Sequence, residues 1–225
     1  GVVAVTGSAH SAVCTAVGPV AEKYEIPFVA GECWSDAVTA AGIPEVFRIT
    51  VANSLVYSVA ADWVKEAGFK NIAIISENSD WGFGIIDVFT KNLQDTGANV
   101  TSFTAERTVS DFTPQLLQLK RADPQPDLIV AGFTGSNLLL MLRQAYDLGL
   151  APSKDTAIFA AGADVLEPEF WNVMGDAGKY VIGNPAGLPG KPDTELSRSF
   201  SEAYQAEFDR PANAVAMEGY DGVMV

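Results

Sequence analysis

Two kinds of segment alternate along the chain. Short apolar runs bounded by turn residues predict buried strands at residues 2–6, 26–30, 46–50, 71–76, 99–106, 127–133, 156–161 and 179–183. Between them lie longer runs whose apolar residues recur at helical spacing. This order predicts an α/β fold in which parallel strands alternate with helices.

Several predicted helices carry start and stop signals. Capping side chains or a first-turn proline mark the starts, and glycine marks the ends. These signals are Asn53 with Gly68, Asp80 with Gly97, Thr113 with Pro114, and Ser136 with Gly149. The first pair predicts a helix at 54–67.

The predicted strands fall into two groups. Residues 71–183 hold five strands with their helices, which is an ordinary domain, and three strands come before them. A Pro- and Gly-rich segment at 184–193 reads as a linker, and only helical runs follow it. We expect two doubly wound parallel-sheet lobes joined by a hinge: an incomplete first lobe from 1–68 and 189–225, and a second lobe from 69–188.

The amino-acid composition limits the kinds of partner that this chain can bind. Hydrophobic residues make up 48% of the 225 and charged residues 19%, which is typical of a folded chain. The net charge of -14 has the wrong sign for nucleic acid. No apolar run approaches the ~20 residues that span a bilayer. Because the chain starts at Gly1 and stops within an apolar stretch, we expect a segment of a longer protein.

The corner SENSDWGFG at 76–84 could be a nucleotide-binding loop, a catalytic turn or one wall of a pocket. Gly82 and Gly84 lack the third glycine of a dinucleotide loop, and no P-loop motif occurs. His10 is the single histidine, and no nucleophile-elbow motif accompanies it. No zinc or calcium spacing is present. We therefore expect no enzyme, no cofactor and no metal.

The corners that follow the strands carry the candidate chemistry. Ligands of open α/β sheets bind beyond the carboxyl ends of the strands. Glycine, small polar residues and aromatics gather there, at GSAHS (7–11), GECWSD (31–36), SENSDWGFG (76–84), FTGSN (133–137) and AGADVLEP (161–168).

In the first two corners each candidate has a structural alternative. The Ser11 hydroxyl and the helix start around it could hold a carboxylate, or Ser8 or Ser11 could only cap the helix. Glu32 could pair with a ligand amine and Trp34 could form an apolar wall, or the two could be a solvated carboxylate and a packed indole. Cys33 could form a disulfide with Cys14 or stay a buried thiol.

The later corners leave similar alternatives. Trp81 could line a pocket or pack onto its own helix. Phe133 could reach a ligand or be the last core residue of its strand. Asp164 could receive an ammonium group or cap the helix that follows.

A series of loose motifs adds a resemblance. In order they are GxxxS (7–11), AVGPVAEKYEIPFVAG (16–31), FRIT (47–50), DWGFG (80–84), DFTPQLLQLK (111–120), PDLIVAGF (126–133), MLRQAYDLGL (141–150) and GYDGVMV (219–225). Together they resemble the branched-chain amino-acid type (leucine/isoleucine/valine-binding) of periplasmic solute-binding protein, a component of ABC importers. The resemblance covers the middle of that family.

The resemblance implies roles for the first corners. Ser11 would bind the ligand carboxylate, and Glu32, Cys33 and Trp34 would give main-chain and side-chain contacts. Glu32 and Trp34 stand where the family has small residues, and Trp81 stands where it usually has tyrosine. These larger side chains favour a broader or more aromatic ligand.

Two further contacts are implied on the second lobe. Phe133 and Thr134, at the end of their strand, would contact the ligand. An acidic residue near Ala163 and Asp164 would hold the amino group of an amino acid, so this acid is either Asp164, displaced by one position, or absent at Ala163.

The function implied is capture of a small molecule between two lobes by hinge closure. The ligand would be a branched-chain or other apolar amino acid, or an aromatic carboxylate, and the partner would be the membrane permease of an ABC importer. The place would be the periplasm or the cell exterior, with or without a lipid anchor upstream. The alternative is a ligand-sensing domain of a receptor or regulator with the same fold.

Overall fold

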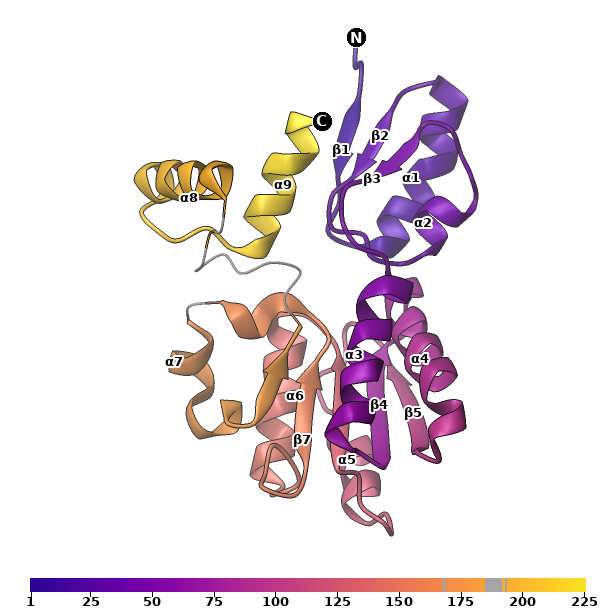
Figure 1. Cartoon of the computed structure of the whole chain (residues 1–225), viewed down its shortest axis with the longest axis vertical. Helices are drawn as coiled ribbons and strands as arrows, with labels where there is room; N and C mark the ends of the chain where they lie inside the picture. Colours follow the sequence, from indigo (N-terminus) through magenta and orange to yellow (C-terminus); the bar gives the residue numbers. More distant parts are fainter. Residues whose placement is uncertain (168, 185–191, 193) are drawn as a thin grey trace. The chain divides into compact units, whose positions relative to one another are not determined.

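The computed structural model describes residues 1–167, 169–184, 192 and 194–225. It divides the chain into two units (Figure 1). Unit 1 comprises Gly1–Leu55 and Pro185–Val225, and unit 2 comprises Val56–Asn184. The sequence pattern places the boundaries after residues 68 and 188. The first lies earlier in the structure, and the second, with the linker of residues 184–193, falls largely outside the described residues.

Helix α3 (Asn53–Ala67) explains the shift of the first boundary. The Tyr57 ring lies 6.1 Å from the Phe89 ring, and the Trp63 ring lies 6.4 Å from the Phe159 ring. These contacts pack most of the helix onto the sheet of unit 2. The sequence pattern shows where the helix ends, but it does not show which sheet the helix covers.

Unit 1 contains a three-stranded parallel sheet in the order β1-β2-β3. Its elements are β1 (Val5–Gly7), α1 (Ser11–Tyr24), β2 (Phe28–Ala30), α2 (Ala37–Ala40), β3 (Val46–Arg48), α8 (Glu195–Phe208) and α9 (Ala214–Met224). Phe28, Val38 and Val46 form its core with residues of α1. Helix α9 packs beside β1, so closely that a side chain at Gly222 would meet Thr6.

Unit 2 contains a five-stranded parallel sheet in the order β5-β4-β6-β7-β8. Besides most of α3, its elements are β4 (Asn71–Glu77), α4 (Asp80–Leu93), η1 (Gln94–Thr96), β5 (Asn99–Ala105), α5 (Thr113–Lys120), β6 (Leu128–Gly132), α6 (Gly135–Asp147), β7 (Ala157–Ala160), η2 (Ala163–Leu166), α7 (Phe170–Met174), η3 (Gly175–Gly178) and β8 (Val181–Gly183). Each predicted strand overlaps one of the observed strands. The predicted α/β architecture with parallel sheets is confirmed.

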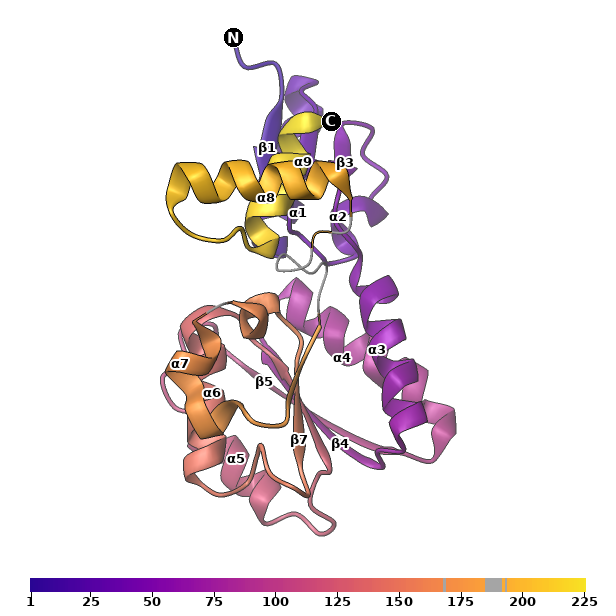
Figure 2. The ribbon, with the colours of Figure 1, turned by 60° about the vertical axis from the view of Figure 1, so that its left-hand side comes forward.

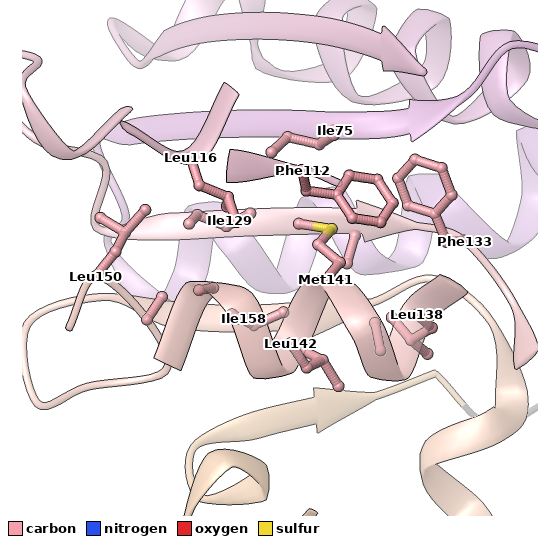
Figure 3. Packing of buried hydrophobic residues seen from close by; sticks show 14 of the residues in the cluster. Ile75, Phe112, Leu116, Ile129, Phe133, Leu138, Met141, Leu142, Leu150 and Ile158 are labelled. Carbon is pink, nitrogen blue, oxygen red and sulfur yellow. The ribbon is translucent and has the colours of Figure 1, made fainter. Parts of the chain in front are cut away.

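The central strands of unit 2 are buried on both faces, as parallel strands require. Figure 2 shows α5 and α6 on one side of this sheet and α3 and α4 on the other. Ile158 belongs to the core beneath α5 and α6 (Figure 3), whereas its neighbour Phe159 packs against Trp63 and Phe89 on the opposite side. This double burial explains why these strands read as continuous apolar runs.

Helix starts differ slightly from the prediction. The cap of α4 is Ser79, whose hydroxyl accepts a hydrogen bond from the Gly82 N–H at 3.3 Å, so the prediction that Asp80 caps this helix is wrong. Helix α6 starts at Gly135 behind Thr134, one residue before the predicted Ser136. Adjacent polar side chains can serve the same role, and the backbone conformation selects between them.

Gly82 gives a prediction about stability. A Cβ at this position would lie 1.9 Å from the Glu77 carbonyl oxygen, because α4 starts directly against the end of β4. We expect Gly82→Ala to lower the free energy of unfolding by about 1–3 kcal/mol through overpacking. Urea denaturation followed by circular dichroism measures the loss.

Gly219→Ala is the matched control. Gly219 also lies in a helix, α9, and a Cβ at this position would have no atom within 4 Å. This control should be neutral or stabilise by up to about 1 kcal/mol. Equal unfolding midpoints for Gly82→Ala and the parent protein would contradict the prediction.

Candidate functional site

Ser11 opens helix α1 just beyond the carboxyl end of β1. Its side chain is 3% exposed, and its hydroxyl oxygen accepts a hydrogen bond from the Ser35 N–H at 3.1 Å. The N-cap residue of α1 is His10, which makes no side-chain cap hydrogen bond. The alternative that Ser8 or Ser11 caps this helix is therefore not what the structure shows. The start of α1 keeps its positive end for an anion, and the Ser11 hydroxyl still has a hydrogen to donate.

A disulfide joins Cys14 in α1 to Cys33 in the loop after β2. The sequence left this pairing open, and the structure decides for it. Cys33 is completely buried, so its side chain is not available to a ligand. Its contribution to a site is to hold the loop of Glu32 and Trp34 against the start of α1.

Arg48, at the end of β3, organises the same loop. Its guanidinium donates hydrogen bonds to the carbonyl oxygens of Cys33, Trp34 and Ser35 at 3.3, 3.4 and 2.9 Å. It also donates to the Thr39 hydroxyl at 2.6 Å. Burial lowers the pKa of this guanidinium, and Asp36 nearby partly offsets the effect. Arg48 was not among the residues predicted from the sequence, although an arginine at the end of a predicted strand is a signal that could have indicated it.

Trp34 is packed rather than open to solvent. Its exposed fraction is 5%, and its carbonyl oxygen also accepts a hydrogen bond from the Asn53 N–H at 2.7 Å. The packed-indole alternative therefore describes Trp34 in this structure. Glu32 is partly exposed, and its N–H donates to the Ser8 carbonyl at 3.1 Å.

Glu218 of α9 is a second residue that was not predicted from the sequence. Its carboxylate accepts a hydrogen bond from the Thr50 hydroxyl at 2.8 Å. Burial raises the pKa of this carboxyl, the neighbouring Thr50 hydroxyl and Trp34 indole lower it, and Asp221 raises it further. Glu218 lies beside a cavity of about 140 Å³, which is lined by Ile49, Thr50, Val51, Ala214, Met217, Glu218 and Asp221.

In unit 2, Trp81 stands in the first turn of α4, beyond the carboxyl end of β4. Its indole N–H donates to the hydroxyl of Tyr57 at 3.1 Å, and that hydroxyl donates to the Ala161 carbonyl at 3.1 Å. Trp81 is partly exposed, whereas Tyr57 is completely buried. The indole is therefore tied to α3 and to the end of β7, and not only to its own helix.

Phe133 and Thr134 follow β6 and differ in exposure. The Phe133 side chain is completely buried and meets the Phe112 ring edge-on at 4.8 Å (Figure 3). It belongs to the core, so only its backbone lies at the strand end. Thr134 is exposed at the start of α6.

Asp164 lies beyond the end of β7, one residue after Ala163, which begins η2. Its carboxylate accepts a hydrogen bond from the Gly135 N–H at 2.7 Å, so it satisfies the start of α6 rather than a helix that follows it. Burial raises the pKa of this carboxyl, and backbone hydrogen bonds from Gly135 and from Asp164 itself partly offset the increase.

Two kinds of feature are missing from the part of the chain that the structure describes. No group of three His, Cys, Asp or Glu side chains is placed to hold a metal ion. Within the same residues, no helix combines the length and apolar character needed to cross a membrane. The chemistry present at the strand ends is that of binding: helix starts, hydroxyls, carboxylates and an indole.

Known proteins that are similar to this chain are also binding proteins. A model of the periplasmic binding protein family matches residues 1–225. The chain is 24% identical, over 92% of its length, to a leucine-, isoleucine-, valine-, threonine- and alanine-binding protein of Pseudomonas aeruginosa. It spans 54% of that relative, which is about half of its length.

Solved structures share the fold. A leucine-binding protein from Thermotoga maritima superposes with a TM-score of 0.88 at 24% identity, covering 99% of this chain and 62% of that one. A solute-binding protein of an ABC transporter from Rhodopseudomonas palustris, in complex with 4-hydroxybenzoate, gives a TM-score of 0.84 at 21% identity and covers 99% and 60%.

The disulfide gives a prediction about stability. It closes a loop between residues 19 apart in sequence, so the chain-entropy model expects its loss to cost about 3 kcal/mol. Urea denaturation of the Cys14→Ser/Cys33→Ser double variant measures this cost. Reductant should destabilise the parent protein and leave the double variant unchanged. Peptide mapping without reductant provides an independent check, and recovery of unlinked Cys14 and Cys33 peptides would refute the pairing.

Asp164 gives a prediction about pH. Because its pKa is raised in the folded state, its ionisation opposes folding. Its contribution to stability is therefore greatest below the ordinary aspartate pKa and declines as the pH rises through the raised value. Asp164→Asn keeps an oxygen for the Gly135 N–H but cannot ionise. Stability relative to the parent protein should shift in favour of Asp164→Asn as the pH rises through this window. Carboxyl NMR titration and urea denaturation between about pH 3 and pH 7 test it, a range that begins below the ordinary aspartate pKa of about 3.9. A pH-independent difference would contradict the prediction.

Proposed function

We propose that this chain, which belongs to the family of periplasmic binding proteins, is an extracytoplasmic solute-binding receptor of an ABC importer. One observation carries the proposal: in each unit, the candidate binding groups lie just past the carboxyl ends of parallel strands. Ligands of open α/β sheets bind at such edges. The chain would recognise a small molecule without making or breaking a covalent bond.

The ligand that these groups fit carries a carboxylate on an apolar body. In unit 1, Ser11 and the uncapped start of α1 supply a hydroxyl and a positive helix end for a carboxylate. In unit 2, Trp81 supplies an indole surface. Similar proteins support both an apolar amino acid and an aromatic acid, since one is named for leucine, isoleucine and valine and another was solved with 4-hydroxybenzoate.

Three carboxylates bear on whether the ligand also carries an amine. Glu32 is partly exposed, Asp164 already accepts a hydrogen bond from Gly135, and Glu218 accepts one from Thr50. An ammonium group would need one of them in its ionised form. A ligand without an amine would need none.

The location and the partner follow from the family. A periplasmic binding protein delivers its ligand to a membrane permease, which we propose as the partner of this protein. The Cys14–Cys33 disulfide supports a location outside the cytoplasm, because such bonds persist in oxidising compartments.

A ligand panel tests the proposal on the full-length protein. Leucine, phenylalanine, their deaminated analogues, benzoate and 4-hydroxybenzoate should be compared by thermal shift. A true ligand at 100 times its Kd should stabilise the protein by about 2.7 kcal/mol. Responses only to amines would favour an amino acid, and responses to deaminated acids would favour an aromatic or aliphatic carboxylate.

Calorimetric titration of variants then tests the site. We expect Trp81→Ala and Ser11→Ala each to weaken the best ligand at least about tenfold, because a packed aromatic or a charge-assisted hydrogen bond is lost. Trp171→Ala is the matched control, since this tryptophan of α7 is 57% exposed and is not one of the candidate residues. Unchanged affinity in both site variants would refute the assignment.

A further inference from the structure

Tyr57 is a completely buried polar residue near the start of α3, and it is not one of the candidate binding residues. Its ring packs 6.1 Å from the Phe89 ring, on the side of the sheet that α3 and α4 cover. Its hydroxyl lies between the indole nitrogen of Trp81 and the carbonyl oxygen of Ala161, 3.1 Å from each.

The direction of both hydrogen bonds is fixed by chemistry. The indole N–H can only donate, and the Ala161 carbonyl can only accept. The Tyr57 hydroxyl must therefore accept from Trp81 and give its single hydrogen to Ala161. This sequence of bonds joins the start of α4, which carries Trp81, to the start of α3 and to the end of β7, which precedes Ala163 and Asp164.

Burial makes this arrangement costly to disturb. A buried polar group that loses its hydrogen-bond partner pays the full cost of having been removed from water. Burial also raises the pKa of the Tyr57 hydroxyl far above the physiological range. The phenol consequently stays protonated and keeps its donor at every pH at which the protein functions.

We propose that Tyr57 is a positioning residue that fixes the indole of Trp81 and thereby determines what this part of the site accepts. With its N–H held by Tyr57, Trp81 presents ring carbon and its π face rather than a hydrogen-bond donor. The ligand group that meets Trp81 is then an apolar side chain or an aromatic ring. This specificity role rests on the proposed function, whereas the positioning role does not.

The positioning role is tested without any ligand. Trp81→Phe assigns the Trp81 indole signal in a ¹H–¹⁵N NMR spectrum of the ¹⁵N-labelled full-length protein. Tyr57→Phe keeps the ring in the core and removes only the hydroxyl, so it should move this indole proton signal upfield and leave the other indole signals in place. Tyr146→Phe removes the hydroxyl of an exposed tyrosine of α6 as a matched control and should move none.

A measurement on the parent protein covers the case in which Tyr57→Phe does not fold. Hydrogen exchange of the Trp81 indole N–H should be at least about tenfold slower than that of Trp171, since one buried hydrogen bond protects it. Trp171→Phe assigns the reference signal. Equal exchange rates, or an unmoved Trp81 signal in folded Tyr57→Phe, would overturn the positioning role.

The specificity role is tested by a double-mutant cycle on the best ligand of the panel. Tyr57→Phe should weaken binding about tenfold in the parent protein and have no effect when Trp81 is already Phe, because Tyr57 acts through Trp81. An equal loss in both backgrounds would overturn the specificity role. If no ligand of the panel binds, the proposed function and the specificity role both fail, and the NMR and exchange results still decide the positioning role.

Discussion

Hydrogen bonding between parallel strands is the constraint on which the candidate site depends. In unit 2, Ile72 of β4 is in register with Leu128 of β6, and Leu128 with Ala157 of β7. The three strands therefore end at one edge, and the turns behind them bring Trp81, Thr134 and Asp164 to that edge. The ends of β4 and β6 also lie too close together for a side chain at Gly132. A Cβ at Gly132 would lie 2.1 Å from the Ser76 hydroxyl, so glycine is required where the strands end.

The sequence predicts the strands well because their burial on two faces leaves continuous apolar runs. It predicts the positions of the site corners for the same reason, since each corner follows a strand. It does not predict which corner side chains are packed: Phe133 and Trp34 read as ligand contacts, and both are buried. It misses Tyr57 and Glu218 because their partners are distant. Tyr57 is 104 residues from Ala161, and Glu218 is 168 residues from Thr50. No local pattern records such a pair.

Local electrostatics differ between the start of α1 and the start of α6, although the net charge of the whole chain is -14. The start of α6 already has a carboxylate, Asp164, hydrogen-bonded to the Gly135 N–H. The start of α1 has no side-chain cap and has Ser11 as its first residue. An incoming carboxylate would be repelled at α6 and stabilised at α1. This difference favours an anionic group at the start of α1 over one at the start of α6.

The first residues of helix α3 make hydrogen bonds to two candidate corners, one within each unit. The Asn53 N–H donates to the Trp34 carbonyl at 2.7 Å, and four residues later the Tyr57 hydroxyl accepts from the Trp81 indole. Both bonds are made by the segment in which the chain passes from unit 1 to unit 2, between Leu55 and Val56. The Tyr57 hydroxyl does what a phenyl ring could not, since phenylalanine at position 57 would fill the same core and leave the Trp81 indole N–H without this hydrogen bond.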